Sequence, residues 1–258
     1  MTLAYEETGP VQAPCVVFIH GLIASRWTWR QTTEQLSEYH CLAPDLPGHG
    51  ESCALPWKSV ADAASQVVEL VRARAGGGKA TLVGLSLGAM VALQALNDAP
   101  DAVDRVVVSG VNLLPLPWNV RLFSLLMLPG LRSERFLKAS AEGLHLPEDA
   151  VPLYQTDLER VSRLTVLKAS LAASGFHLPK RLAGNACPLL SLAGENENIR
   201  VLDSQRILLK AMPNAQACKV PGERHGWIGQ QPELWAQTLY AWLGQDSLPE
   251  ALIHLQRY

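Results

Sequence analysis

The sequence predicts an α/β fold: a mostly parallel sheet flanked by helices on both faces, with a helical insertion after the fourth strand. Short, continuously apolar runs alternate along the chain with longer segments whose apolar residues recur at helical spacing. Strands without polar alternation are typical of a sheet that is buried on both faces. The alternation breaks once, between about residues 112 and 185, where apolar β-branched runs are missing and helical patterns remain.

The fold is predicted as one domain over residues 1–258, with a core formed by 1–111 and 186–258. Strands and helices alternate in both pieces of the core. The predicted strands cover 16–19, 41–45, 81–83, 106–108, 189–193 and 217–220, and the predicted helices 29–36, 60–75, 87–96, 202–212 and 233–243. Within the insertion, residues 112–185, helical patterns cover 121–128 and 158–173.

The composition narrows the possible partners. The chain has 258 residues, of which 48% are hydrophobic and 18% charged, and its formal net charge is −2. This length suits one domain with a substantial core. The lack of a basic excess argues against nucleic acid or an anionic membrane surface as partner, which leaves a small molecule. The most apolar stretch, 111–131, contains three prolines and an arginine, so no integral membrane segment is expected.

The cysteines and histidines give no sign of a metal or disulfide framework. The five cysteines are scattered, odd in number and free of C-x-x-C spacing, and residues 1–7 lack the basic and apolar regions of a secretory signal. These features predict reduced thiols in the cytoplasm. The seven histidines are dispersed, so no metal is expected, and no other cofactor is implied.

Residues 84–88 read Gly-Leu-Ser-Leu-Gly, directly after an apolar strand and directly before a helix. This matches G-x-S-x-G, in which a sharp turn lifts a serine hydroxyl above the sheet. The flanking glycines are needed because side chains there would collide with the neighbouring strand and helix. Backbone N–H groups at the helix N-terminus favour developing negative charge. We therefore predict Ser86 as a nucleophile rather than a serine that only caps the helix.

A serine hydroxyl needs a neighbouring base to take its proton. If the chain order is serine, acid, histidine, the base follows the last strand. His225 lies there, between the strand 217–220 and the helix 233–243, and is the predicted general base. The remaining histidines lie in turns, before a strand, in the insertion or in the terminal tail.

Four segments together resemble the α/β-hydrolase family in its esterase-like form with a helical cap, and the resemblance covers nearly the whole chain. They are His20-Gly21-Leu22, the segment 45–52, the turn at Ser86 and the loop of His225. The resemblance implies that residues 112–185 form a cap over the nucleophile. It also implies an oxyanion hole formed by the backbone N–H groups of Leu22 and Leu87, with His20 holding the first of these loops in shape.

The third catalytic residue departs from the family pattern. The family usually has Gly-x-x-Asp after the strand that follows the cap, whereas this chain has Gly194-Glu195-Asn196-Glu197. The resemblance therefore assigns the acid to Glu197, which would orient the imidazole of His225. Glu195 is the second candidate, and a dyad without a strong acid is the third. The segment 109–112 after the preceding strand offers no carboxylate.

Large apolar residues of the insertion could line a substrate pocket or pack the cap onto the core. Tryptophans beside the proposed catalytic loops leave the same two possibilities open. The candidate substrate-binding residues are Trp118, Phe123, Met127 and Trp227, with Trp27 and Trp29 as further cases.

These features predict a serine hydrolase that cleaves carboxylic esters of small to medium apolar acyl groups. A carbon–carbon bond hydrolase or a lyase on the same scaffold is the alternative, although Ala89, Met90 and Val91 provide no basic group to bind an anionic substrate. A ligand receptor without catalysis is a third hypothesis, and the presence of both Ser86 and His225 argues against it. The oligomeric state stays open.

Overall fold

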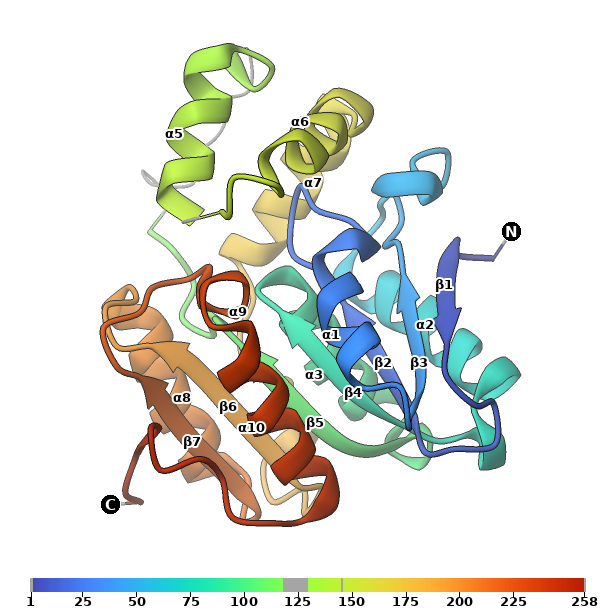
Figure 1. Cartoon of the computed structure of the whole chain (residues 1–258), viewed down its shortest axis with the longest axis vertical. Helices are drawn as coiled ribbons and strands as arrows, with labels where there is room; N and C mark the ends of the chain where they lie inside the picture. The colour runs from blue at the N-terminus through green and yellow to red at the C-terminus, as the bar shows by residue number, and fades with distance from the viewer. Residues whose placement is uncertain (1, 118–129, 145, 258) are drawn as a thin grey trace.

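The computed structural model describes residues 2–117, 130–144 and 146–257. Within these ranges eight strands form one sheet in the order β1-β3-β2-β4-β5-β6-β7-β8 (Figure 1). The strands are β1 Tyr5–Thr8, β2 Cys15–Ile19, β3 His40–Pro44, β4 Ala80–Leu85, β5 Val103–Ser109, β6 Leu189–Gly194, β7 Ala215–Val220 and β8 Ile253–His254.

The six central strands are parallel, and the two edge strands β1 and β8 run antiparallel to their neighbours. The predicted mostly parallel sheet is therefore confirmed, and each of the six predicted strands overlaps one of the parallel strands. The edge strands were not predicted. β1, with the sequence YEET, lacks an apolar run, and β8 has two residues, so neither produces a periodic signal.

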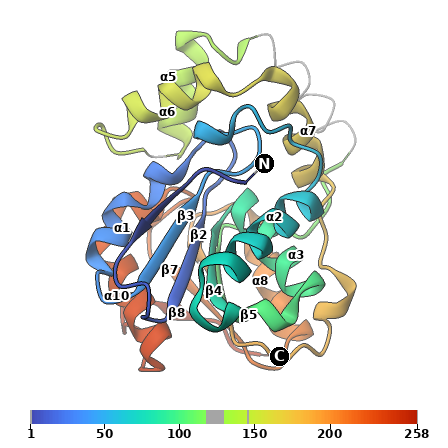
Figure 2. The same cartoon turned by 90° about the vertical axis from the view of Figure 1, so that its right-hand side faces the viewer.

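Helices cover both faces of the sheet, as Figure 2 shows. On one face lie α1 Arg30–Gln35 and α10 Pro232–Gly244, and on the other α2 Val60–Arg74, α3 Leu87–Asp98 and α8 Ile199–Ala211. The short helix α9, Trp227–Gln230, precedes α10. Single 3₁₀ turns lie at Arg26–Trp29, Gly50–Ser52, Gly76–Gly78, Pro100–Ala102 and Lys180–Leu182.

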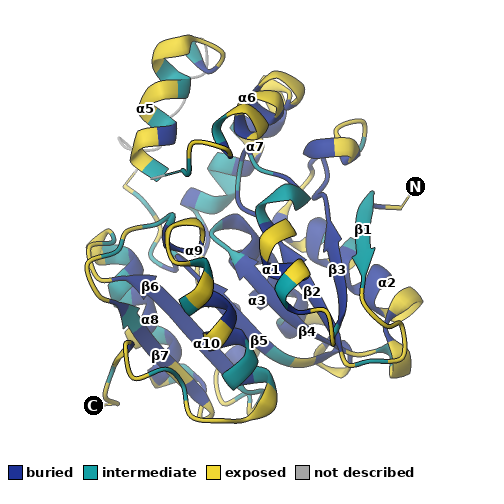
Figure 3. Ribbon diagram, in the orientation of Figure 1, coloured by how far each residue is buried: buried dark blue, intermediate teal, exposed yellow. Residues whose placement is uncertain are grey.

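The sheet separates two apolar cores because successive strand residues face opposite sides. In β2, Val17 and Ile19 belong to the core beneath α2 and α3, whereas Val16 and Phe18 belong to the core beneath α1 and α10. All four side chains are fully buried, and Figure 3 shows the same burial along the central strands. Burial of such a side chain contributes roughly 1.5–3 kcal/mol each, which makes the central strands a rigid base for the loops at their ends.

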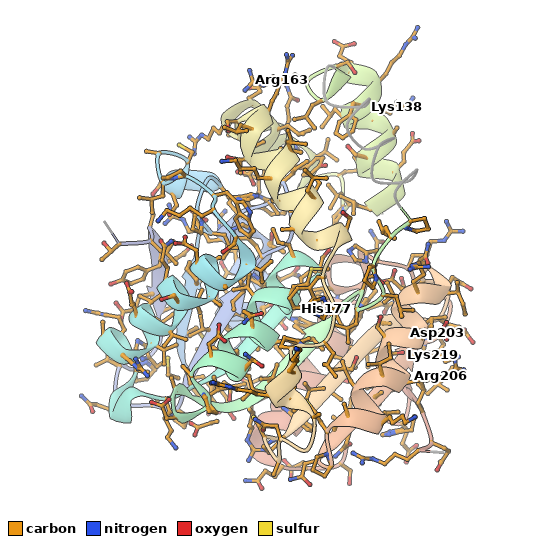
Figure 4. The ribbon with its side chains drawn as sticks, turned by 180° about the vertical axis from the view of Figure 1, so that it is seen from behind. Lys138, Arg163, His177, Asp203, Arg206 and Lys219 are labelled. Carbon is orange, nitrogen blue, oxygen red and sulfur yellow. The ribbon has the colours of Figure 1, made fainter. Side chains whose placement is uncertain are left out.

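The insertion between β5 and β6 is helical in its described part. It contains α5 Glu134–Leu144, α6 Val151–Arg160 and α7 Arg163–Ser174, which lie beyond one end of the sheet (Figure 1). Exposed charged side chains such as Lys138 and Arg163 lie on its outer surface, as the view from behind shows (Figure 4). The predicted helix 121–128 lies outside the described residues.

The single helical stretch predicted over 158–173 is wrong, because two helices share it. Ser162 has an extended backbone, with φ −73° and ψ 145°, and its side chain accepts a hydrogen bond from the Thr165 amide. Such an N-cap begins a new helix, so α6 ends at Arg160 and α7 starts at Arg163.

No helix in the described part of the chain is long and apolar enough to cross a membrane.

All five cysteines are free. Burial raises the pKa of Cys15, Cys41 and Cys218 to about 12, so these thiols are protonated and pack as small apolar groups. Among residues 2–117, 130–144 and 146–257, no group of three potential metal ligands comes together.

The turn from β4 into α3 brings the helix backbone against two strands. A Cβ atom on Gly88 would lie 2.0 Å from the Ile19 carbonyl oxygen, and one on Gly84 would lie 2.4 Å from the Gly88 carbonyl oxygen. Both contacts are with backbone atoms, which cannot relieve a clash by a rotamer change as side-chain atoms can. The collision expected from the sequence is therefore confirmed, and these two glycines allow α3 to start directly after β4.

Two buried histidines stabilise the loops that follow β2 and β3. His20 Nε2 accepts a hydrogen bond from the Leu46 amide at 2.9 Å, so its Nδ1 carries the proton and donates to the Gly21 carbonyl oxygen at 2.7 Å. His49 Nδ1 donates to the Pro47 carbonyl oxygen at 3.0 Å. Burial lowers the pKa of His20 to about 4 and that of His49 to about 3. Both side chains are therefore neutral at pH 7.

Replacing Gly88 by alanine should lower the free energy of unfolding by about 2–3 kcal/mol, because the new methyl group overlaps the Ile19 carbonyl. Chemical denaturation measures this loss. Gly76→Ala is the matched control, since a Cβ there meets nothing within 4 Å, and it should change stability by less than about 0.5 kcal/mol. Equal losses in the two variants would contradict the close approach.

Acidification from pH 7 to pH 5 should destabilise the protein through His20 and His49. The unfolded chain takes up protons below the ordinary histidine pKa of about 6.5, whereas the folded chain does so near pH 4 and pH 3. The contribution of these histidines to the free energy of unfolding is therefore fully present above pH 6.5. It decreases as the pH falls to 5, by about 2 kcal/mol for each histidine. Urea denaturation of the wild type, His49→Gln and exposed His177→Gln tests this. His49→Gln should lose about half of the pH dependence, whereas His177→Gln should retain it.

Candidate active site

Ser86 lies at the sharpest point of the β4–α3 turn. Its backbone has φ 55° and ψ −110°, a conformation that is uncommon for a non-glycine residue and that costs about 1–3 kcal/mol. The Ser86 amide donates to the Ser109 carbonyl oxygen at 2.9 Å, which ties the turn to β5. Although Ser86 is the residue before α3, its hydroxyl accepts no capping hydrogen bond from the described first turn of that helix. The side chain is therefore available for another partner.

Ser86 and His225 line the same cavity, which has a volume of about 940 Å³. Gly21 and Leu22, from the loop after β2, line it as well. The three loops thus follow β2, β4 and β7. In a parallel sheet the carboxyl ends of the strands meet at one edge, which is where a ligand crevice forms in open α/β sheets.

A buried carboxylate lies behind His225. Nδ1 of His225 is 2.8 Å from Oε1 of Glu197, whose side chain is 5% exposed. Because a carboxylate accepts, Nδ1 carries a proton and donates a hydrogen bond to Glu197. This leaves Nε2 of the neutral ring as a proton acceptor. The Glu197–His225 pair therefore has the tautomer that a general base requires.

Glu195 occupies a different place in the same turn. Its Oε2 accepts a hydrogen bond from the Gly222 amide at 3.0 Å, and it lies on the exposed side of the loop. The Asn196 amide donates to the Glu223 carbonyl oxygen at 2.8 Å. These bonds tie the turn after β6 to the loop that carries His225.

Gly110 lies beside the Glu197–His225 pair and is absent from the predicted site. A Cβ on Gly110 would lie 2.6 Å from Cε1 of His225 and 3.2 Å from Oε1 of Glu197. Its φ of +64° also favours glycine. In the sequence, the segment 109–112 shows only that this loop offers no carboxylate. Gly110 contributes the space that the imidazole of His225 occupies.

The candidate oxyanion-hole residues each stand next to a strained backbone. Leu22 lines the cavity and precedes Ile23, whose φ is 55°. Leu87 follows Ser86 and begins α3, where the first amides have no partner within the helix. His20, predicted to hold the loop of Leu22 in shape, bonds Gly21 on one side and Leu46 on the other.

The tryptophans separate into cavity and core. Trp27 lines the cavity, whereas Trp29 is fully buried and packs between Phe18 and Trp235. Trp227 is fully buried too; its Nε1 donates to Ser109 Oγ at 2.9 Å, and its ring meets Trp235 edge-on at 5.4 Å. Within the described residues the structure thus places Trp227 in the core and not on the cavity wall. The other candidates, Trp118, Phe123 and Met127, lie outside the described residues.

The cavity wall is mainly apolar and comes from both the cap and the core. The apolar lining includes Leu22, Ile23, Trp27, Leu85, Leu144, Leu146, Pro147, Ala150, Leu153, Tyr154 and Ile228. Polar side chains contribute from α1, namely Arg30, Gln31 and Glu34, and from the cap, namely Ser140 and Asp149. An organic molecule with a substantial apolar part suits such a cavity.

Known proteins resemble the chain in sequence and in structure. A protein of Klebsiella pneumoniae named "Putative carbamate hydrolase RutD" is 31% identical over 83% of this chain and 85% of its own. A 2-succinyl-6-hydroxy-2,4-cyclohexadiene-1-carboxylate synthase of Serratia proteamaculans is 32% identical, over 41% of this chain and 42% of its own. The solved structure of a thermophilic esterase from Thermogutta terrifontis superposes with a TM-score of 0.78, over 94% of this chain and 93% of its own, at 22% identity.

The low identity of the esterase limits that likeness to the fold, which agrees with the mixed eight-stranded sheet and helical insertion described above. A family model also matches most of the sequence. Residues 16–238 match the model of the alpha/beta hydrolase family, and this span includes Ser86, Glu197 and His225. The chain therefore belongs to the alpha/beta hydrolase family.

Proposed function

We propose that this protein is a serine hydrolase that cleaves carboxylic esters of small to medium apolar acyl groups through an acyl-enzyme. The observation that supports this most strongly is the arrangement of three groups. Ser86 and His225 line one cavity, and Oε1 of the buried Glu197 carboxylate lies 2.8 Å from Nδ1 of the His225 imidazole. This is the order of nucleophile, base and orienting acid that acyl transfer requires.

In the proposed reaction, Oγ of Ser86 attacks the ester carbonyl carbon while Nε2 of His225 takes the hydroxyl proton. The imidazolium then gives that proton to the departing alkoxide, and an acyl-enzyme remains. Water attacks the acyl carbon next, again losing a proton to Nε2, and the returning proton regenerates the Ser86 hydroxyl as the acid departs. Glu197 stays ionised and stabilises the imidazolium in both steps.

The amides of Leu22 and Leu87 are the proposed donors to the oxyanion that forms in each step. Leu87 is supported by its place at the start of α3, where helical amides are free and the helix dipole favours negative charge. Leu22 is supported by its position on the cavity that Ser86 also lines, directly after Gly21, at which a Cβ would lie 3.6 Å from the Cβ of Ser86. Donors fixed in advance stabilise the transition state without reorganising during the reaction.

An apolar acyl group is proposed as the substrate's main recognition element because apolar side chains predominate on the cavity wall. The cap supplies several of them, including Leu144, Leu146 and Leu153, so it would form the acyl pocket over Ser86.

The five cysteines are free, and burial raises the pKa of four of them. Free thiols suit a reducing compartment, and we propose the cytoplasm.

A lyase or carbon–carbon bond hydrolase is the second candidate, supported by the similarity to the Serratia proteamaculans synthase over part of the chain. The first turn of α3 is the feature that weighs against it. Ala89, Met90 and Val91 are buried and apolar, so that turn provides no cation for an anionic substrate. A receptor without catalysis would have no need of the oriented Glu197–His225 pair.

Hydrolysis of p-nitrophenyl esters from acetyl to dodecanoyl tests the ester proposal. The wild type should turn over esters of this series because the cavity wall is mainly apolar, and the chain length with the highest rate measures the acyl group that the site prefers. Ser86→Ala should abolish turnover, and His225→Ala should lower kcat about 10³-fold or more. Turnover that survives in Ser86→Ala would exclude the proposed nucleophile. Turnover of a 1,3-diketone instead of esters would favour the second candidate.

Glu197→Gln and Glu195→Gln form a matched pair for identifying the acid. Glu197→Gln should lower kcat about 10²–10⁴-fold, because a glutamine amide no longer stabilises the imidazolium. Glu195→Gln should retain nearly full kcat, since its carboxylate bonds the Gly222 amide and not His225. Steady-state kinetics on the best p-nitrophenyl ester measures both. A larger loss in Glu195→Gln would transfer the role to that residue.

A further inference from the structure

Ile23, in the loop after β2, has a conformation that needs outside support. It is β-branched, 7% exposed, and has φ 55° in the left-handed region, which is unfavourable for such a side chain. The preceding amide is that of Leu22, the proposed oxyanion donor. If the strain were released, the backbone of the loop would rotate at Ile23, and the Leu22 amide, which lies one peptide unit earlier, would lose its support.

From the core side, Asp45 holds this loop. Its side chain is 1% exposed, and Oδ1 accepts a hydrogen bond from the Arg26 amide at 2.8 Å. Oδ2 accepts from the Glu51 amide at 2.9 Å, which joins the loop to the turn after β3. The loop is thus fixed at its far end by a carboxylate from the core.

From the cap side, a second buried carboxylate holds the same loop. Asp157 lies on α6, is 4% exposed, and its Oδ2 accepts a hydrogen bond from Trp27 Nε1 at 2.6 Å. Burial raises the pKa of Asp157, and the Trp27 and Ser25 side chains oppose that rise. Burying a carboxylate in an apolar environment costs free energy unless hydrogen-bond donors surround it. The position of the cap that keeps the bond from Trp27 to Asp157 is therefore favoured over positions that break it.

Apolar contacts also join the cap helix α6 to the loop after β2. Ile23 belongs to one buried cluster with Tyr154 and Leu158 of α6, and Leu22 and Trp27 pack against that cluster. The strained residue therefore faces the cap, and Asp157 lies between the cap helix and the loop. Cap and loop pack as one unit around this carboxylate.

We propose that Asp157 is a positioning residue for catalysis: by holding Trp27 it keeps the Leu22 amide aimed, so that the oxyanion hole is complete only while the cap is docked. This inference rests on the proposed function of Ser86 and Leu22. It predicts an effect on the transition state rather than on substrate binding, because Asp157 does not line the described part of the cavity.

The test compares Asp157→Leu, Asp157→Asn and Glu159→Gln with the wild type. Leucine has a similar size but no acceptor, whereas asparagine keeps a carbonyl oxygen for the indole N–H. Glu159 is exposed on the same helix and serves as the control. Two readouts are used: the rate at which a small alkyl fluorophosphonate labels Ser86, and kcat and KM for p-nitrophenyl butyrate.

Asp157→Leu should slow labelling and lower kcat about 10-fold or more, with KM changed less than about twofold. Asp157→Asn should recover most of the loss, and Glu159→Gln should match the wild type. Trp27→Phe removes the indole donor and should slow labelling similarly. If Asp157→Leu does not melt cooperatively, Trp27→Phe replaces it in the labelling readout alone, because Trp27 also lines the cavity and its replacement can change KM. Wild-type rates in Asp157→Leu, or a raised KM with unchanged kcat, would overturn the inference.

The labelling readout separates this inference from the proposed function. If the wild type is labelled at Ser86 but does not hydrolyse the ester, the ester proposal fails, and the labelling rates of the variants still decide the role of Asp157. If the wild type is labelled normally and Asp157→Leu equals it, the inference about Asp157 alone fails. A wild type that resists labelling would overturn both.

Discussion

The close approach of α3 to β2 and β4 is the constraint on which the site depends. Gly84 and Gly88 allow the helix to start one residue after the strand, and that geometry forces Ser86 into its strained backbone. The hydrogen bond from the Ser86 amide to Ser109 then ties the turn to β5, beside Gly110. The space next to Gly110 accommodates the imidazole of His225. The close approach of α3 thus places Ser86, the proposed nucleophile, and Gly110 leaves room for His225, the proposed base.

Much of the fold could be predicted from the sequence because its strongest signals are local. Apolar runs such as Val16–Ile19 are buried on both faces, and turns such as 84–88 have few alternative conformations. The edge strands escaped prediction because β1 and β8 pair through backbone without a distinctive side-chain pattern. The break between α6 and α7 depends on a single hydroxyl, that of Ser162, within a continuous helical pattern.

The positions of the candidate site residues could be predicted where chain order determines them and not where packing does. Ser86, Glu197 and His225 each follow a predicted strand, so parallel topology alone brings their loops to one edge of the sheet. Trp227 shows the limit, because its position two residues after His225 says nothing about direction. The start of α9 turns its ring into the core, while Ile228 meets the cavity. The contact between Trp27 and Asp157 spans 130 residues and leaves no local signal.

That contact also gives the molecule a natural spectroscopic marker. The indole proton of Trp27 is held by a carboxylate from the insertion, so it is protected from solvent while the two parts stay together. Its replacement by deuterium therefore requires them to separate, and the rate of that replacement counts how often they do. Among the seven indoles of the chain, this signal would follow the opening of the cap without any introduced label.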